Sequence, residues 1–431
     1  METSEPVTGC IETSKWDIFR AAIFIGGISI FLYFYLDARV PEPIPEKWKV
    51  KVMDAMMKTY GHTISWLVYF GLTEPFSDLD RKISDWFVLT MMTGKPWGLG
   101  YDSRLLIQDT TLAGVRVKIY QPIQDVGKEY RPALIYLHGG GWTLLSVDSY
   151  DPLMRKIARE SGVVIISVDY RRSPQHPFPE PLNDCLEVFE YVIENYDELG
   201  LNPHKIAIGG DSAGGNMAAA ITLRHKSKVA MQLLLVPSLQ FSNWRTSSML
   251  ENSQYLNKSI NNLDAIYFVL NYLGADHQYK DAFLANNHTT ADFKKSQHGD
   301  FVDQSIWMPR KYVRDEKMKY NLETTYNDGH KHIFNSIKDK IVDPLLAPML
   351  ADDESLENLP YTYIMTAGYD ILRDDGIMFY ERLSQLGENA HLSHFDDGFH
   401  NAIFFPHGPL RMGVAIRIVD DIVLQLKRKL K

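Results

Sequence analysis

A serine flanked by glycines at the junction of a strand and a helix constrains this chain more than any other feature. The short apolar run 206–211 ends in Gly-Gly-Asp, and a helical stretch, residues 213–224, begins directly after Ser212. Gly210 and Gly214 stand two residues on either side of that serine. Glycines at these positions let the backbone turn sharply and project the hydroxyl, a geometry known as a nucleophile elbow. Ser212 is therefore the candidate nucleophile.

Short apolar runs alternate with helical stretches from residue 104 onwards. Residues 115–120 alternate as a half-buried strand does, and the buried parallel strands are expected at 133–137, 163–168, 205–208, 231–236 and 361–365. The helices between and after them are expected at 152–160, 181–196, 213–224, 376–386 and 412–429. Strand alternating with helix indicates βαβ units. The sequence thus predicts an α/β fold with a mostly parallel central sheet and helices on both faces.

Three consecutive glycines follow the expected strand 133–137, within His138-Gly139-Gly140-Gly141-Trp142. In this type of fold the site lies at the carboxyl ends of the strands. Glycine backbones can approach a substrate with unobstructed N–H groups, which an oxyanion hole requires. We assign Gly139 and Gly140 as oxyanion donors, joined by the N–H group of Ala213. Trp142, beside this loop, is the candidate substrate-binding residue and suggests a hydrophobic acyl or alcohol group.

The acid that would orient a catalytic histidine is expected after the strand 361–365. Asp370 lies at the exit of that strand. Asp374 and Asp375 stand where a helix begins and are better explained as N-terminal caps favoured by the helix dipole. Asp370 is therefore the candidate acid.

The candidate base is His400, which follows a glycine loop beyond the expected edge strand 391–395. A histidine there can swing over the end of the sheet towards Ser212 and take its proton. His394 lies inside that strand and His407 beside prolines, so both are expected to be structural. The chain order Ser, Asp, His is the order that this elbow requires.

Charge and cysteine content exclude other classes of function. The net charge of -9 argues against a nucleic-acid surface. The cysteines are Cys10 and Cys185, which allow neither a disulfide framework nor a cysteine-based zinc site, and the fourteen histidines show no metal-ligand spacing. We therefore predict no metal and no cofactor.

An apolar run near the N-terminus, residues 18–36, is interrupted by Arg20 alone and follows a polar tail, residues 1–17. Nineteen residues suffice to cross a bilayer. No small-residue cleavage site follows, and the proline-rich stretch 41–45 comes next, so we predict an uncleaved transmembrane anchor with a stiff spacer. A buried amphipathic helix is the alternative. Positive charges flank both sides, but the sequons at Asn257 and Asn287 favour a lumenal C-terminal part.

The remaining chain divides into two parts. Residues 37–103 carry apolar and aromatic positions at helical spacing, and we expect a spacer and cap helices over the mouth of the site; core-packing helices are an equal alternative. Residues 104–431 form the expected catalytic domain. Within it, residues 276–343 are polar with weak periodicity and are expected to be an insertion over the edge or rim of the sheet.

Together these motifs resemble the hormone-sensitive-lipase-like family of α/β-hydrolases, most closely its arylacetamide deacetylase and neutral cholesterol ester hydrolase branch. The resemblance covers nearly the whole chain and rests on the anchor and on residues 138–142, 169–171, 176–179, 210–215, 345–348, 370–376 and 398–400. It implies an α/β-hydrolase fold with a helical cap, carboxylester hydrolysis, and a single-pass type II protein of the endoplasmic reticulum membrane with a lumenal catalytic domain. The chain departs from the family at residues 172–175 and in its longer 276–343 segment.

The predicted activity is hydrolysis of hydrophobic esters, or of arylamides, through an acyl-enzyme on Ser212. An acyltransferase would use the same residues up to the acyl-enzyme and differ only in whether water or an alcohol attacks it. A non-catalytic ligand-binding protein on the same fold is the third alternative, against which stands the presence of all three triad candidates.

Overall fold

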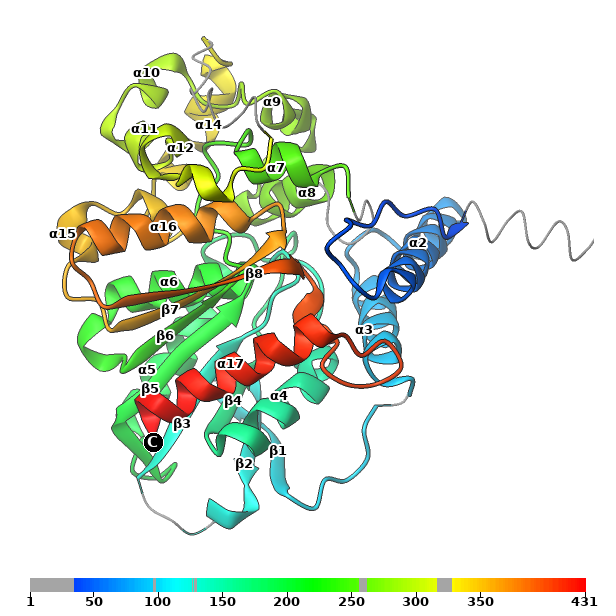
Figure 1. Ribbon diagram of the computed structural model, residues 1–431, viewed down its shortest axis with the longest axis vertical. Helices are drawn as coiled ribbons and strands as arrows, with labels where there is room; N and C mark the ends of the chain where they lie inside the picture. The colour runs from blue at the N-terminus through cyan, green and yellow to red at the C-terminus, as the bar shows by residue number, and fades with distance from the viewer. Residues whose placement is uncertain (1–34, 96–97, 126, 128–129, 256–261, 316–327) are drawn as a thin grey trace, which may run out of the picture.

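The central element is a twisted sheet that runs through the middle of the molecule (Figure 1). The computed structural model describes residues 35–95, 98–125, 127, 130–255, 262–315 and 328–431. In this part of the chain the sheet has eight strands in the order β1-β2-β4-β3-β5-β6-β7-β8. They are β1 (Leu105–Leu112), β2 (Val115–Pro122), β3 (Arg131–Leu137), β4 (Val164–Val168), β5 (Leu201–Asp211), β6 (Met231–Leu235), β7 (Tyr361–Tyr369) and β8 (Ala390–Phe399). Strand β2 pairs antiparallel with β1 and β4, and all other pairs are parallel. The prediction of a mostly parallel sheet is confirmed.

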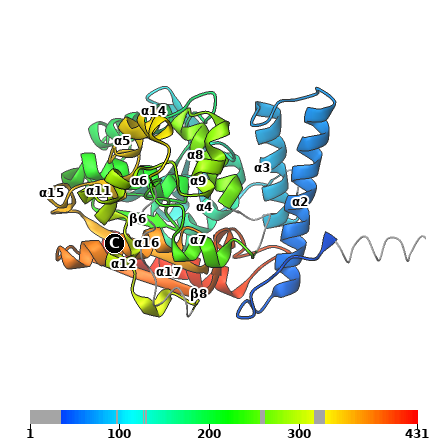
Figure 2. The ribbon, with the colours of Figure 1, turned by 90° about the horizontal axis from the view of Figure 1, so that it is seen from above.

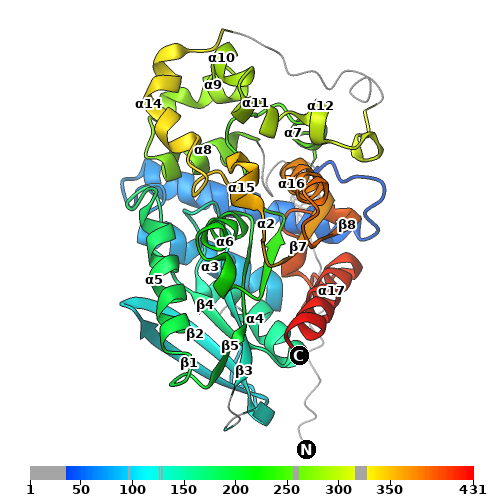
Figure 3. The same cartoon turned by 90° about the vertical axis from the view of Figure 1, so that its left-hand side faces the viewer.

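Helices cover both faces of the sheet, as predicted (Figures 1 and 3). One face carries α5 (Glu180–Glu194), α6 (Ala213–Arg224) and α16 (Arg373–Gln385); the other carries α4 (Val147–Ser161) and α17 (Gly413–Leu430). Side chains of the central strands alternate between the two faces, so that Ile135 packs with the first group and Leu134 with the second. Because both faces are buried, strands of this kind read as continuous apolar runs in the sequence.

A cap lies over the carboxyl ends of the parallel strands and has two parts. The first is a helical hairpin of α2 (Lys47–Tyr69) and α3 (Asp78–Thr93), which stands to one side of the sheet with α2 outermost (Figure 2). Ser77 caps α3 by accepting from the N–H of Asp80, and Gly94 ends it in a left-handed conformation with φ of 68°. The predicted helices in residues 37–103 are present.

The second part of the cap comes from residues 247–343. It contains α7 (Ser247–Asn252), α8 (Asn262–Leu273), α9 (Lys280–Leu284), α10 (Ala291–Lys294), α11 (Gln297–Phe301), α12 (Gln304–Trp307) and α14 (Lys331–Ile341). These helices lie above the sheet, opposite the end at which the C-terminus is found (Figure 1). Several have only four or five residues, too short for a helical period to show in the sequence. A further short helix, α15 (Asp353–Leu356), follows and leads into β7.

Some sequence-based boundaries differ from the structure. Helix α4 begins at Val147, five residues before the predicted start at Pro152, because the Ser146 hydroxyl caps its N-terminus. The edge strand β1 was not predicted: its middle residues are largely exposed and polar, so it lacks the apolar run of a buried strand.

The predicted transmembrane anchor, residues 18–36, lies almost entirely outside the described residues. Of the helices that the structure does describe, none is long and apolar enough to span a membrane. The sequon at Asn257 also falls outside the described ranges. Asn287 is half-buried within the cap, and the Thr289 hydroxyl of its sequon is buried, 3.4 Å from the Ser242 carbonyl oxygen.

Candidate active site

Ser212 occupies a strained turn between β5 and α6. Its φ of 54° and ψ of -117° lie outside the usual region for a residue with a side chain, as a nucleophile elbow requires. The flanking glycines are sterically necessary. A Cβ on Gly210 would stand 2.3 Å from the Leu137 carbonyl oxygen, and one on Gly214 only 1.9 Å from it. The predicted elbow is therefore the observed local geometry.

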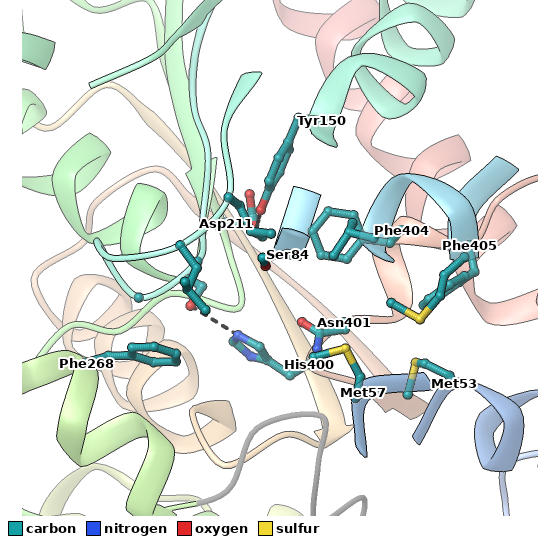
Figure 4. A pocket seen from close by; sticks show the side chains of 17 residues that line it. Met53, Met57, Ser84, Tyr150, Asp211, Phe268, His400, Asn401, Phe404 and Phe405 are labelled. Atoms are coloured by element: carbon teal, nitrogen blue, oxygen red, sulfur yellow. Dashed lines mark hydrogen bonds between the residues drawn. The ribbon is translucent and has the colours of Figure 1, made fainter. Parts of the chain in front are cut away.

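The structure brings the predicted nucleophile, base and acid together; Figure 4 shows His400 in the pocket. Nε2 of His400 is 3.1 Å from Oγ of Ser212, and Nδ1 of His400 is 2.9 Å from Oδ1 of Asp370. Asp370 follows β7 and is fully buried, and His400 directly follows β8. In this arrangement the imidazole can take the serine proton while the carboxylate holds its tautomer.

The pKa of His400 is raised above its ordinary value. Burial disfavours the imidazolium, but the carboxylates of Asp370 and Asp211 together outweigh that penalty. The site therefore stabilises the positive charge that forms when His400 accepts the proton from Ser212.

The oxyanion donors differ from the prediction by one residue. The N–H group of Gly139 is already engaged: it donates to the Tyr150 hydroxyl, at 2.9 Å, and to Oδ1 of Asp211, at 3.2 Å. Gly140 and Gly141 line the pocket beside Ser212. Within the described part of the chain, the N–H groups of Gly140, Gly141 and Ala213 have no hydrogen-bond acceptor. They are the available donors, so Gly141 replaces Gly139 in the candidate oxyanion hole.

Asp211 holds this loop in place and was not singled out from the sequence. Its two carboxylate oxygens accept from the hydroxyls of Tyr136, at 2.8 Å, and Tyr150, at 2.6 Å, in addition to the Gly139 N–H group. Burial raises the pKa of Asp211, although the two tyrosine hydroxyls counteract it. The only signal in the sequence was a carboxylate at the end of an otherwise apolar strand.

Trp142 does not line the pocket, contrary to the prediction that it binds substrate. It is 2% exposed, stacks on Tyr272 of α8 with ring centroids 4.5 Å apart, and meets Phe241 edge to face. The indole therefore fastens the glycine loop to the cap. The aromatic ring that faces the pocket is Phe268, one turn earlier in α8, which lies against Gly141.

The pocket that ends at Ser212 is mainly apolar, with a volume of about 110 Å³. Figure 4 shows methionines of α2 and the Phe404–Phe405 pair on one side of His400 and Phe268 on the other. Its apolar lining consists of Met53, Met57, Val88, Met91, Leu144, Leu145, Phe268, Phe404 and Phe405, and its polar lining includes Ser84, Tyr150 and Asn401. The α2–α3 hairpin thus forms one wall of the site, in agreement with the expected position of the cap helices.

The loop of the catalytic acid is held by the cap. Asn252 of α7 donates to the carbonyl oxygens of Asp370, at 2.7 Å, and Gly368, at 3.2 Å. Arg314 donates to the Gly368 carbonyl oxygen at 2.7 Å and to the Asn252 side chain, and its guanidinium lies 4.2 Å above the Tyr369 ring. No periodicity or motif in the sequence indicated this contact.

The acids and histidines that the sequence analysis set aside as structural make contacts outside the triad. Asp374 and Asp375 lie in the first turn of α16, but neither caps it, because the N-cap residue is Leu372 and no side chain caps the helix. Asp374 instead accepts from Ser247 and Ser248 at the start of α7, and Asp375 accepts from the N–H of Leu239, before the cap. Burial raises the pKa of Asp375 to about 7.

His394 lies within β8, where its Nδ1 is 2.8 Å from the Thr366 hydroxyl, and burial lowers its pKa to about 4. His407 is away from the triad, and burial lowers its pKa as well. Neither histidine lines the pocket of Ser212.

Comparisons with known proteins agree with this site and fold. A family model described as alpha/beta hydrolase fold matches residues 134–298 and 288–404. Neutral cholesterol ester hydrolase 1 of Mus musculus is 29% identical, over 95% of this chain and 99% of the relative. Arylacetamide deacetylase of Bos taurus is 32% identical, over 88% and 92%. The solved structure of a Pyrobaculum calidifontis esterase, 25% identical, superposes with a TM-score of 0.58 over 80% of this chain and 90% of that one.

The family match spans the strands and loops that carry Ser212, Asp370 and His400, and the relatives match almost from end to end. The chain therefore belongs to the hormone-sensitive-lipase-like family of α/β-hydrolases, a family of serine hydrolases of carboxylic esters, in the branch of arylacetamide deacetylase and neutral cholesterol ester hydrolase.

Proposed function

We propose that this protein is a membrane-anchored carboxylesterase that hydrolyses hydrophobic esters through an acyl-enzyme on Ser212. One observation carries the proposal. The chain of hydrogen bonds that runs to Asp370 through His400 begins at Ser212, which lines an apolar pocket beside backbone N–H groups that have no acceptor among the described residues.

The reaction follows from this geometry. His400 takes the Ser212 proton at Nε2 as Oγ attacks the carbonyl carbon, and the carbonyl π electrons move to oxygen. The N–H groups of Gly140, Gly141 and Ala213 bind the resulting oxyanion. As the tetrahedral intermediate collapses, the imidazolium returns the proton to the departing alcohol. Water, deprotonated by His400, then attacks the acyl carbon of the acyl-enzyme. As this second tetrahedral intermediate collapses, the bond to Oγ of Ser212 breaks, the imidazolium returns its proton to Oγ, and the acid is released.

The pocket supports a hydrophobic substrate. Methionine side chains from two cap helices form part of its wall, and methionine adapts its shape to irregular apolar groups. The names of two relatives, a neutral cholesterol ester hydrolase and an arylacetamide deacetylase, refer to compounds that carry a sterol or an aryl group. An arylamide is therefore included among the proposed substrates.

A chain-length series of p-nitrophenyl esters with the purified full-length protein tests the proposal. We expect hydrolysis, covalent labelling by a fluorophosphonate, and loss of both in Ser212→Ala, with kcat lower by several orders of magnitude. Hydrolysis that persists in Ser212→Ala without labelling would show that another residue is the nucleophile. Repeating the assay with an added alcohol separates a hydrolase from an acyltransferase by the product.

We also propose that the anchor is a type II signal anchor in the endoplasmic reticulum membrane and that the catalytic domain is lumenal. The apolar run 18–36, the sequons at Asn257 and Asn287, and the family resemblance support this location. In microsomes the catalytic domain should resist added protease until detergent opens the vesicles. Digestion of the catalytic domain in intact microsomes would place it in the cytosol instead.

A further inference from the structure

The end of helix α2 carries a cluster of apolar side chains with no cover in the described structure. Trp66, Tyr69, Phe70 and Leu72 are 61%, 79%, 63% and 65% exposed. The Trp66 and Phe70 rings stack with centroids 5.7 Å apart, and Tyr69 meets both edge to face. We call these four residues the α2 aromatic patch. Soluble proteins scatter such residues singly, so a contiguous group marks an interaction surface.

The chain that enters from the proposed anchor lies on the same face of α2. Tyr35, at the end of the apolar run 18–36, has its hydroxyl 3.0 Å from the Thr59 hydroxyl, and its ring contacts His62. The positions 59, 62, 66 and 70 are spaced by three or four residues and therefore share one side of a helix. The α2 aromatic patch continues the surface on which the anchor segment ends.

This shared face limits how far the patch can lie from the end of the anchor segment. Seven residues separate Thr59 from Trp66, about 10 Å along a helix. An anchor that ends near Tyr35 reaches the boundary between hydrocarbon and water there. The headgroup layer on each side of the hydrocarbon is roughly 5–8 Å thick, and tryptophan and tyrosine are enriched in it.

The opposite side of the same helix lines the active site. Met53 and Met57 face the pocket of Ser212, while α2 is the outermost element on that side of the molecule (Figures 2 and 4). Helix α2 therefore has an outer face towards the anchor and an inner face towards the substrate.

We propose that the α2 aromatic patch inserts into the interfacial layer of the lipid bilayer, so that α2 forms a partition between the membrane and the pocket. Esters dissolved in the bilayer then reach Ser212 along the edge of the α2–α3 hairpin. The inference rests on the proposed function, because it takes the anchor and the hydrophobic ester substrate from there.

Fluorescence quenching by lipid tests the insertion without reference to activity. The full-length protein is reconstituted in phosphatidylcholine vesicles whose acyl chains carry bromine. Trp66→Phe should lower the fraction of the tryptophan fluorescence that the brominated lipid quenches, whereas Trp244→Phe, which removes a buried tryptophan just before α7, should leave that fraction unchanged. If the brominated lipid quenches the same fraction of the fluorescence in Trp66→Phe and in the unchanged protein, the proposal is overturned. That result would indicate that another segment or a second copy of the chain covers the α2 aromatic patch.

Kinetics on two forms of substrate test the route. The double variant Trp66→Ser/Phe70→Ser should lower hydrolysis of a long-chain p-nitrophenyl ester dissolved in the vesicles by about 10-fold, because it removes two side chains that bury apolar area in the membrane. Water-soluble p-nitrophenyl butyrate should be hydrolysed at the same rate as before. Tyr130→Ser, which removes an exposed aromatic at the start of β3, is the matched control and should change neither rate.

Equal rates of the double variant and the unchanged protein on the vesicle-bound ester would overturn the proposed route. Failure of the unchanged protein on both esters would instead contradict the proposed function, and the quenching measurement would still decide the position of the patch.

Discussion

The N–H group of Gly139 donates to the carboxylate of Asp211, the residue that precedes the nucleophile. The loop that supplies the oxyanion donors is thereby tied to the strand that supplies the serine. The Tyr150 hydroxyl strengthens this link, because it accepts from Gly139 and donates to the other oxygen of Asp211. The distance between oxyanion hole and nucleophile depends on these buried groups.

Tyr150→Phe should therefore reduce both activity and stability. Removing the hydroxyl leaves a buried carboxylate with one donor fewer, which lowers the free energy of unfolding by about 1–3 kcal/mol. It also loosens the Gly139–Gly141 loop, so that kcat should fall by roughly 10-fold while KM changes little. Tyr120→Phe is the matched control, since the Tyr120 hydroxyl is buried in the same way and donates to Asp151 of the same helix α4, away from the pocket. It should lose stability and keep kcat; an equal fall of kcat in both variants would contradict the role of Tyr150.

Asp370→Asn should change the pH profile as well as the rate. His400 acts as a base only when neutral, so kcat/KM rises as pH increases through its pKa, which Asp370 and Asp211 raise. Without the Asp370 charge, burial dominates and lowers that pKa, and the acid limb of the profile moves to lower pH. The value of kcat should fall by about 10⁴-fold because the histidine loses its orienting carboxylate. An acid limb at the original pH would show that Asp370 does not set the pKa of His400.

Arg314→Met tests whether the cap positions the acid. The loss of its hydrogen bond to Gly368 and of its contact with Asn252 should let Asp370 move away from His400. Small displacements of catalytic groups are costly, so kcat should fall by roughly 10- to 100-fold, and the acid limb should shift to lower pH as in Asp370→Asn. Arg382→Met is the control: that guanidinium binds the Met349 carbonyl oxygen and lies over the Phe301 ring, away from the acid loop. Its loss should lower the melting temperature without moving the acid limb.

Phe268→Ala should alter the preference for acyl chain length. The ring lies against Gly141 in the pocket wall, next to the candidate oxyanion hole. Its removal enlarges the space near Ser212, so the ratio of kcat/KM for a long-chain to a short-chain p-nitrophenyl ester should rise. Trp142→Phe, which alters a ring outside the pocket, should leave that ratio as it is. A rise of the ratio in Trp142→Phe alone would restore the substrate-binding role expected from the sequence.

The parts of the site that follow from the sequence are those set by local backbone geometry. A glycine-flanked serine between a strand and a helix, and an acid and a histidine after the last two strands, identify a spatial cluster because parallel strands present their carboxyl ends together. For Ser212, Asp370 and His400, position along the chain was therefore sufficient to predict their proximity.

Side-chain contacts between distant segments could not be predicted in this way. Tyr150 and Asp211 accept hydrogen bonds from the N–H group of Gly139. These two residues therefore decide which two of the three glycines keep their N–H groups available in the pocket. Trp142 is next to the loop in the sequence, but its indole ring is buried because it stacks on the ring of Tyr272 in the cap. Each of these contacts joins residues more than ten positions apart in the sequence. No local sequence pattern encodes how such residues are placed relative to one another.

The contact of Arg314 and Asn252 with the loop that carries Asp370 limits how the cap can be exchanged. Two side chains of the cap hold the loop that carries Asp370, so a chimaera that received a foreign cap would also have to receive a partner for the Gly368 and Asp370 carbonyl oxygens. A redesign of this cap for new substrates would therefore have to keep Asn252 and Arg314 in place.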